Sequence, residues 1–258
     1  MKQFFGTSQR GNLDEALQGL HHPQFIMLLS NDRQFDDHVK ALEQRFPGVP
    51  SIGCIGMCYQ IGVTENGVGV IAFSDGVSAA ANVLEQVSVM PVKYIQRLER
   101  DVQTVGGSGL DTVCIDFCSG NDACVLTTIN TVLHGRNIGL VGGTGDQGRV
   151  SANGRVCRDA VAYALVRNQN GRVKTYKENI YHQLGSYRFV ASDTDRANYI
   201  LGSLNGKPAK QVYKSILHVT DEEILTRTFQ NPFGKLNGDD TCIISIKEVN
   251  GNALACFR

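Results

Sequence analysis

The sequence predicts a mixed α/β fold, with a mixed sheet or two packed sheets and flanking helices. Its opening reads as a buried strand at 25–29, an amphipathic helix at 35–46 and a second buried strand at 51–56. That order favours a parallel βαβ unit. Further along, Asn153-Gly154 separates two short apolar runs, which is a strong signal for an antiparallel hairpin.

The elements of the first half follow from apolar spacing and turn residues. Phe25 to Leu29 is an uninterrupted apolar run, typical of a strand buried on both faces. Pro47-Gly48 ends the helix that precedes the second buried strand. The other expected elements are a helix at 12–20, strands at 68–73 and 77–90 around the turn Ser74-Asp75-Gly76, a helix at 92–105 after Pro91, a buried strand at 112–117 and a helix at 123–133.

Beyond residue 148 the pattern changes to short strands. We expect strands at 161–166, 173–176, 187–191 and 199–204, a helix at 208–217, and strands at 241–246 and 253–257 joined at Asn250-Gly251. No internal repeat is visible. A core strand at the last residues is typical of a chain that ends inside a second domain.

Composition indicates a globular protein without an electrostatic preference for nucleic acid. Of the 258 residues 42% are hydrophobic, and 25 Lys and Arg balance 25 Asp and Glu. No apolar run is long enough for a signal peptide or a bilayer span, which predicts a cytoplasmic location. In that compartment the eight cysteines are expected to be reduced and mostly buried.

The glycine stretch 139–148 is the most distinctive segment. Gly143, Gly145 and Gly148 fit the G-x-G-x-x-G spacing of a dinucleotide-binding turn. That motif requires a helix directly after the glycines, whereas here the Asn153-Gly154 hairpin follows. We therefore expect a glycine turn that presents backbone N–H groups to a neighbouring pocket, and not a nucleotide site.

Candidate side chains come from the strand at 112–117 and the loop after it. On a strand, Cys114, Asp116 and Cys118 share one face. The following loop, Ser119 to Asp122, can cap the next helix or hold a ligand. No spacing predicts a metal site, and no group of residues assembles a catalytic centre, although Cys118 or Cys54 could serve as a nucleophile.

Several segments, in order, resemble the FIST sensory domain. They are His22 to Ile26, Arg45 to Cys54, the glycine stretch Leu140 to Asp146, and Leu204 to Tyr213; Val173 to Tyr181 is similar to the variety joined to methyl-accepting chemotaxis signalling domains. The resemblance implies a small-ligand input role in a signal-transduction protein. Some relatives are haem-binding nitric-oxide sensors. Ile55 to Tyr59 departs from the small polar turn usual in the family, which puts the ligand inferred by analogy in doubt.

The leading interpretation is a non-catalytic sensor of a small molecule, amino-acid-like ligands included, with a fused or associated chemotaxis signalling domain as partner. Residues 1–217 would be the FIST N-terminal ligand-binding domain, and 218–258 the truncated start of the C-terminal domain. The predicted ligand-binding residues are Cys54, Asp116, Cys118, Asn121, Asp122, Gly142, Gly143, Thr144 and Asp146. No cofactor is required in this interpretation. The alternatives are haem-based nitric-oxide sensing, with His182 as axial ligand, and a cysteine-dependent enzyme acting on a small metabolite.

Overall fold

The computed structural model describes residues 1–56, 58–59, 63–89, 91–120, 122–176, 178–238 and 240–257. Two compact units, Met1–Tyr176 and Lys177–Arg258, divide the chain. This division by contacts differs from the expected division into family domains at 217/218, which stays a prediction. The mixed α/β fold class is confirmed.

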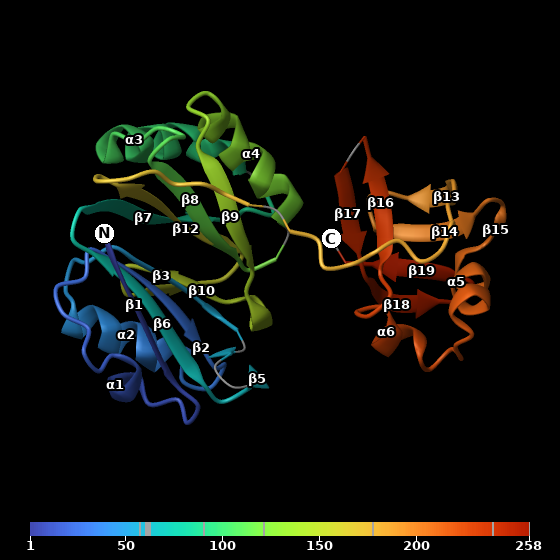
Figure 1. Cartoon of the computed structure of the whole chain (residues 1–258), viewed down its shortest axis with the longest axis horizontal. Coiled ribbons are helices and arrows are strands. Elements are labelled where there is room, and N and C mark those ends of the chain that lie inside the picture. The colour runs from blue at the N-terminus through green and yellow to red at the C-terminus, as the bar shows by residue number, and fades with distance from the viewer. Residues whose placement is uncertain are drawn as a thin grey trace. The chain divides into compact units, whose positions relative to one another are not determined.

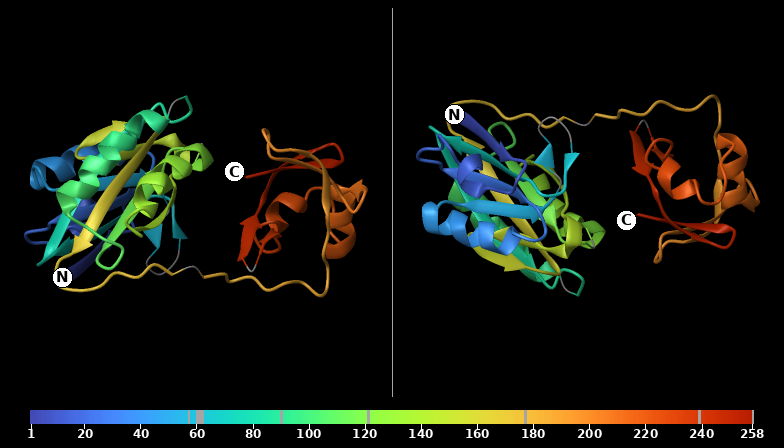
Figure 2. Two further views of the ribbon diagram at one scale, coloured as in Figure 1. Left: turned by 90° about the horizontal axis from the view of Figure 1, so that it is seen from above. Right: turned by 90° about the horizontal axis from the view of Figure 1, so that it is seen from below.

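The first unit stacks helices, sheet, sheet and helices (Figure 1). One sheet, here called the first sheet, has the order β1-β6-β2-β3-β10-β11, and the second sheet has the order β7-β12-β8-β9. Figure 2 shows α3 and α4 covering the outer face of the second sheet in the view from above, and α1 and α2 covering the first sheet in the view from below. The predicted arrangement of two packed sheets with flanking helices is therefore present.

The strands of this unit are β1 (Lys2–Ser8), β2 (Phe25–Ser30), β3 (Ser51–Ile55), β4 (Cys58–Tyr59), β5 (Val63–Thr64), β6 (Val68–Ser74), β7 (Val77–Glu85), β8 (Thr112–Cys118), β9 (Gly139–Thr144), β10 (Val150–Ala152), β11 (Arg155–Cys157) and β12 (Ala160–Asn168). The helices are α1 (Leu13–Ala16), α2 (Phe35–Arg45), α3 (Ile95–Val105) and α4 (Asp122–His134), with the 3₁₀ turns η1 (Pro91–Tyr94) and η2 (Asp146–Gly148). The parallel pairing of β2 with β3 confirms the predicted βαβ unit, and β10–β11 confirms the Asn153-Gly154 hairpin.

Side-chain alternation along β12 separates two of the three cores. Ala160, Ala162 and Ala164 face the first sheet, where their small side chains allow the sheets to pack closely. The intervening residues, Val161, Tyr163 and Leu165, belong to the core under α3 and α4. A third core lies between the first sheet and the helices α1 and α2. Strand β12 is thus buried on both faces.

The first unit repeats one topology twice. Residues 2–74 give the strand order β1-β6-β2-β3 and residues 77–168 give β7-β12-β8-β9, each with a parallel pair joined by a helix. In each half a short hairpin precedes the last strand. The register repeats as well: Ser30 pairs with Val68 and Ile55, and Cys118 pairs with Val161 and Thr144. The structure therefore contains a repeat of topology that is not visible in the sequence.

This register defines which residues of the two halves are equivalent. Leu28 pairs with Val70 and Gly53, while Asp116 pairs with Tyr163 and Gly142. Leu28 is thus equivalent to Asp116, and Gly53 to Gly142. Matching hydrogen bonds mark the strand ends. The Gly56 N–H donates to the Ser30 carbonyl at 3.1 Å, and the Gly145 N–H donates to the Cys118 carbonyl at 2.8 Å.

The second unit contains a sheet of order β13-β14-β19-β18, with β15 beside β14, and the hairpin β16–β17. Its elements are β13 (Ala191–Asp195), β14 (Ile200–Leu204), β15 (Lys207–Pro208), α5 (Ala209–Leu217), α6 (Ile224–Arg227), β16 (Phe233–Asn237), β17 (Asp240–Ile244), β18 (Ile246–Asn250) and β19 (Ala253–Cys256). Val212 and Tyr213 of α5 pack with Ile246 and Leu254 in its core. None of the helices in the described ranges of either unit is long and apolar enough to cross a bilayer.

Several predicted elements differ from the structure. The helix expected at 12–20 is limited to Leu13–Ala16, and residues 173–176 are not a strand. The strand expected at 187–191 begins at Ala191. Near the end of the chain, the residues predicted to pair with 253–257 belong mostly to β17, which pairs with β16. Strand β19 pairs with β18 instead. Short, polar segments of this kind lack the strong periodicity that makes longer elements predictable.

A buried histidine gives the first unit a testable pH dependence. His38 on α2 lies 3.0 Å from the Gly11 carbonyl through Nε2 and 2.7 Å from Ser30 Oγ through Nδ1, so Nε2 donates and Nδ1 accepts. Burial lowers the pKa of His38 below its ordinary 6.5, against a smaller raising effect of the Gly11 hydrogen bond. The folded state therefore binds a proton at His38 less readily than the unfolded state does. The free energy of unfolding is highest above pH 6.5 and decreases as the pH falls below that value.

We expect the Tm of the wild-type chain to fall more steeply than that of His38→Gln between about pH 7.5 and pH 5, a range that includes the ordinary pKa of histidine. Differential scanning calorimetry at several pH values measures both slopes. Equal slopes would show that His38 does not set this dependence.

Candidate functional site

The parallel strands of both sheets end at one edge of the first unit. We call this the carboxyl edge; it comprises the ends of β2, β3, β8 and β9 and the connecting residues 145–149. Gly145 joins the two sheets there, since its N–H binds Cys118 of β8 and a Cβ added to it would lie 2.8 Å from the Cβ of Cys54 in β3. A side chain at 145 would therefore force these strand ends apart. In open α/β sheets, ligands bind beyond such strand ends.

A buried carboxyl group lies at this edge. Asp116 is 2% exposed and faces the core under α4, and the Cys118 thiol donates to its Oδ2 at 3.2 Å. The predicted common face of Cys114, Asp116 and Cys118 is confirmed by their shared burial. Burial also raises the pKa of the Cys114 thiol, with a further contribution from Asp116.

The neighbouring residue Gly142 makes room for Asp116. A Cβ at Gly142 would lie 2.1 Å from both Oδ1 and the main-chain oxygen of Asp116, which no side chain can tolerate. A Cβ at the adjacent Gly143 would meet no atom within 4 Å. Gly142 is thus required by the position of the carboxyl group, whereas Gly143 is not.

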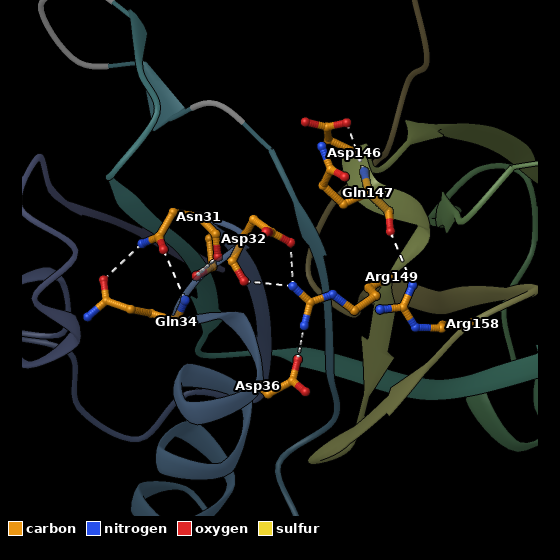
Figure 3. Close-up of polar contacts among 9 residues, drawn as sticks. Asn31, Asp32, Gln34, Asp36, Asp146, Gln147, Arg149 and Arg158 are labelled. Atoms are coloured by element: carbon orange, nitrogen blue, oxygen red, sulfur yellow. Dashed lines mark hydrogen bonds and ion pairs between the residues drawn. The ribbon is translucent and has the colours of Figure 1, made fainter.

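An arginine links the carboxyl edge to α2. Arg149 forms ion pairs with Asp32 and with Asp36, the latter at 2.6 Å, and also donates to the Asp32 carbonyl at 2.6 Å (Figure 3). Its guanidinium lies 5.8 Å from the ring centre of the buried Phe35. The side chain is 15% exposed, and Nε is buried without a hydrogen-bond partner in the described structure. Arg149 therefore fastens the start of β10 to the first turn of α2.

The turn before Arg149 has an unusual backbone. Gln147 and Gly148 have φ values of 52° and 63°, in the left-handed region that a side chain such as Gln147 rarely adopts. Asp146 accepts a hydrogen bond from the Gln147 N–H at 2.8 Å, and Arg158 donates to the Gln147 carbonyl at 3.5 Å (Figure 3). Asp146 is exposed, so its carboxylate is accessible at the carboxyl edge.

The elements that end at the carboxyl edge carry most of the predicted binding residues: Cys54, Asp116, Cys118, Gly142, Gly143, Thr144 and Asp146. Cys54 faces the core between the sheets, whereas Cys118 faces the core under α3 and α4. Asn121 lies outside the described residues. Asp122 begins α4, and its side chain is not described. His182 is exposed in the second unit, on a segment without regular structure.

One structural expectation for these residues is wrong. Gly142, Gly143 and Thr144 do not form a turn; they are the last residues of β9, paired with Asp116, Phe117 and Cys118 of β8. The turn follows at η2. Sequence reasoning also missed Arg149 with Asp32 and Asp36, because these residues lie more than a hundred positions apart and no local pattern joins them.

Two surface hollows lie away from the carboxyl edge. One is on the outer face of α4, around Asn130 and His134, and the other is around His22 and Phe46. Neither contains a predicted binding residue. Within the described ranges, no group of three His, Cys, Asp or Glu side chains is arranged to hold a metal ion.

Comparison with protein families matches residues 24–207, more than half of the chain, to the FIST N domain. The chain belongs to the FIST family. FIST is a family of sensory domains, so this chain carries a sensory module. A search of curated proteins gives no match. The FIST match begins just before β2, includes the carboxyl edge and continues into the second unit as far as β15.

The contrast between the two adjacent glycines gives a matched prediction. Gly142→Ala should destabilise the first unit by about 1–3 kcal/mol, because its methyl group would overlap Asp116. Gly143→Ala should be neutral or slightly stabilising, since a methyl group there meets nothing within 4 Å. Urea unfolding of both variants tests the difference. Equal free energies of unfolding would contradict the placement of Asp116 over Gly142.

Proposed function

We propose that this FIST chain is a non-catalytic input module that binds a small molecule at the carboxyl edge. In this proposal the Asp116 carboxyl group anchors a hydrogen-bond donor of the ligand, and Asp146 provides a second polar contact. Backbone groups of Gly142, Gly143 and Thr144 line the edge of the site. Cys54 and Cys118 contribute sulfur-containing walls, and Asn121 and Asp122 complete the site where α4 begins.

The observation that carries this proposal is the difference between the two halves at equivalent positions. In the first half, Leu28 is buried in the apolar core. At the equivalent position of the second half, the side chain is Asp116, which is also buried. A buried carboxyl group carries a desolvation cost that leucine does not, so a core position with leucine in one half and aspartate in the other is a candidate for function. A donor-bearing ligand such as an amino acid fits this chemistry.

The connection 145–149 offers a route from the site to the rest of the module. It begins next to Cys54 and Cys118 and ends at Arg149, which is fastened to α2. A ligand that shifts β9 or η2 would therefore alter the Arg149 contacts. Binding would bias the population of two arrangements, and the signal would be that shift.

We further propose that the module acts in the cytoplasm on a fused or associated chemotaxis-type signalling domain. The similarity of Val173 to Tyr181 to FIST domains joined to methyl-accepting signalling domains supports this partner. A haem-based sensor and a cysteine-dependent enzyme are the alternatives. His182 is exposed, and Cys54 and Cys118 are buried, so neither alternative has comparable support.

A screen of amino acids, nucleotides and haem by thermal shift tests the proposal. A ligand at a hundred times its Kd should stabilise the protein by about 2.7 kcal/mol. A sharp, shifted Soret band after haem addition would favour the haem alternative instead. If no compound in the screen raises the Tm, the result contradicts the small-molecule proposal.

The internal repeat supplies the decisive variant. Asp116→Leu introduces the side chain found at the equivalent position 28, so the chain should fold with unchanged or higher stability, by up to roughly 2 kcal/mol. The ligand-induced rise in Tm should be lost. Asp146→Ala serves as a milder comparison, with a smaller loss of affinity.

A different outcome would contradict the assignment of Asp116. If Asp116→Leu unfolds the first unit, the carboxyl group is structural. If the variant keeps the full ligand-induced shift, the ligand binds elsewhere.

A further inference from the structure

Strand β9 forms one edge of the second sheet. In the described parts of the chain it pairs only with β8, and its residues Gly139–Thr144 include no charged residue and no proline. Gly142, Gly143 and Thr144 are exposed, and Val141 is 37% exposed. Edge strands of soluble proteins usually carry lysine, proline or a bulge that prevents pairing with another strand. Strand β9 has none of these in its own sequence, and among the described residues Thr175 lies against Gly139 at the start of the strand.

The internal repeat shows what occupies the equivalent edge. In the first half the outer edge of β3 is covered by β10, which runs antiparallel to it with Ser151 opposite Gly53. The Asn153 N–H donates to the Ser51 carbonyl at 3.0 Å, so Ser51, Gly53 and Ile55 direct their backbone groups toward β10. The hairpin of the second half thus completes the sheet of the first half.

The backbone direction of β9 matches that of β3. The Gly145 N–H points toward β8, as the equivalent Gly56 N–H points toward β2. The N–H and C=O groups of successive residues point to alternate sides of a strand. Those of Leu140 and Gly142 therefore point away from β8, as those of Ser51 and Gly53 point away from β2. The outer edge of β9 therefore has the same form as an edge that accepts an antiparallel strand elsewhere in this molecule.

We propose that the outer edge of β9 binds an extended segment of a partner polypeptide, which adds as an antiparallel strand with its central residue opposite Gly142. Main-chain hydrogen bonds would provide the affinity, as in other cases of strand addition. The second sheet would thereby gain the strand that β10 supplies to the first. This surface adjoins the ligand contacts proposed above and shares Gly142 and the Asp116 carboxyl group with them.

The repeat also defines the side chain that the partner presents opposite Gly142. At the equivalent position, Ser151 Oγ lies 2.8 Å from where a Cβ of Gly53 would be, so the incoming side chain uses the space left by the glycine. At Gly142 the Asp116 carboxyl group reaches into that space, since its Oδ1 lies 2.1 Å from where a Cβ of Gly142 would be. A small residue with a hydrogen-bond donor, such as serine, fits there, whereas an acidic or bulky residue does not.

Nuclear magnetic resonance of the full chain with a defined peptide tests this proposal. The probe is a capped peptide of residues 149–156, which contains the strand that already pairs with the equivalent edge. Saturable shifts of the amides of 139–144 are expected. A peptide methylated on the nitrogen of Ser151 should bind at least about tenfold more weakly, because it lacks a central main-chain donor.

Variants of Leu140 provide the matched control on the protein side. Leu140→Pro and Leu140→Ala both remove the side chain, but only the proline removes the outward N–H. The peptide should bind the alanine variant like the wild type and the proline variant at least about tenfold more weakly. Circular dichroism and the Tm confirm that both variants are folded.

Three outcomes would overturn the proposal. The first is absence of saturable shifts at 139–144, or shifts that the methylated peptide reproduces. The second is slow hydrogen exchange of the Leu140 and Gly142 amides in the free protein, which would show that the edge is already paired within the molecule. The third is self-association through β9 that Leu140→Pro abolishes, which would assign the edge to a second copy.

Discussion

The contact at Gly145 is the constraint on which the carboxyl edge depends. It brings the ends of a strand from each sheet together, and a single added methyl group would lie 2.8 Å from the Cβ of Cys54. The chain then has only a few residues in which to cross from β9 to β10. The left-handed conformations of Gln147 and Gly148 and the burial of Arg149 follow from that short crossing. The same segment thus positions the candidate site and ties it to α2.

The repeat makes the polar features of the second half interpretable. Leu28 and Ser30 of β2 serve ordinary roles, one in an apolar core and the other as a partner of His38. At the equivalent positions β8 carries Asp116 and Cys118, which bind each other. Because the surrounding strands keep the same register in both halves, the exchange is not required by the fold. It distinguishes the half in which we place the ligand.

Sequence reasoning predicted the strongly patterned elements and missed features that depend on distant contacts. The apolar run at 25–29 and the Asn153-Gly154 hairpin were predictable because local signals determine them. The extension of β9 through Gly142 and Gly143 was not, since glycine disfavours strands and only the closeness of Asp116 explains why it is needed there. The pairing of Arg149 with Asp32, which joins the two halves, has no local signal either.

We propose above that a small ligand binds at the carboxyl edge beside Asp116. Mapping of amide chemical shifts in the full chain, with the compound that raises the Tm most, tests it directly. We expect the largest changes at residues 116–119 and 142–149. Changes confined to the second unit, or to the hollow on α4 around Asn130, would contradict it.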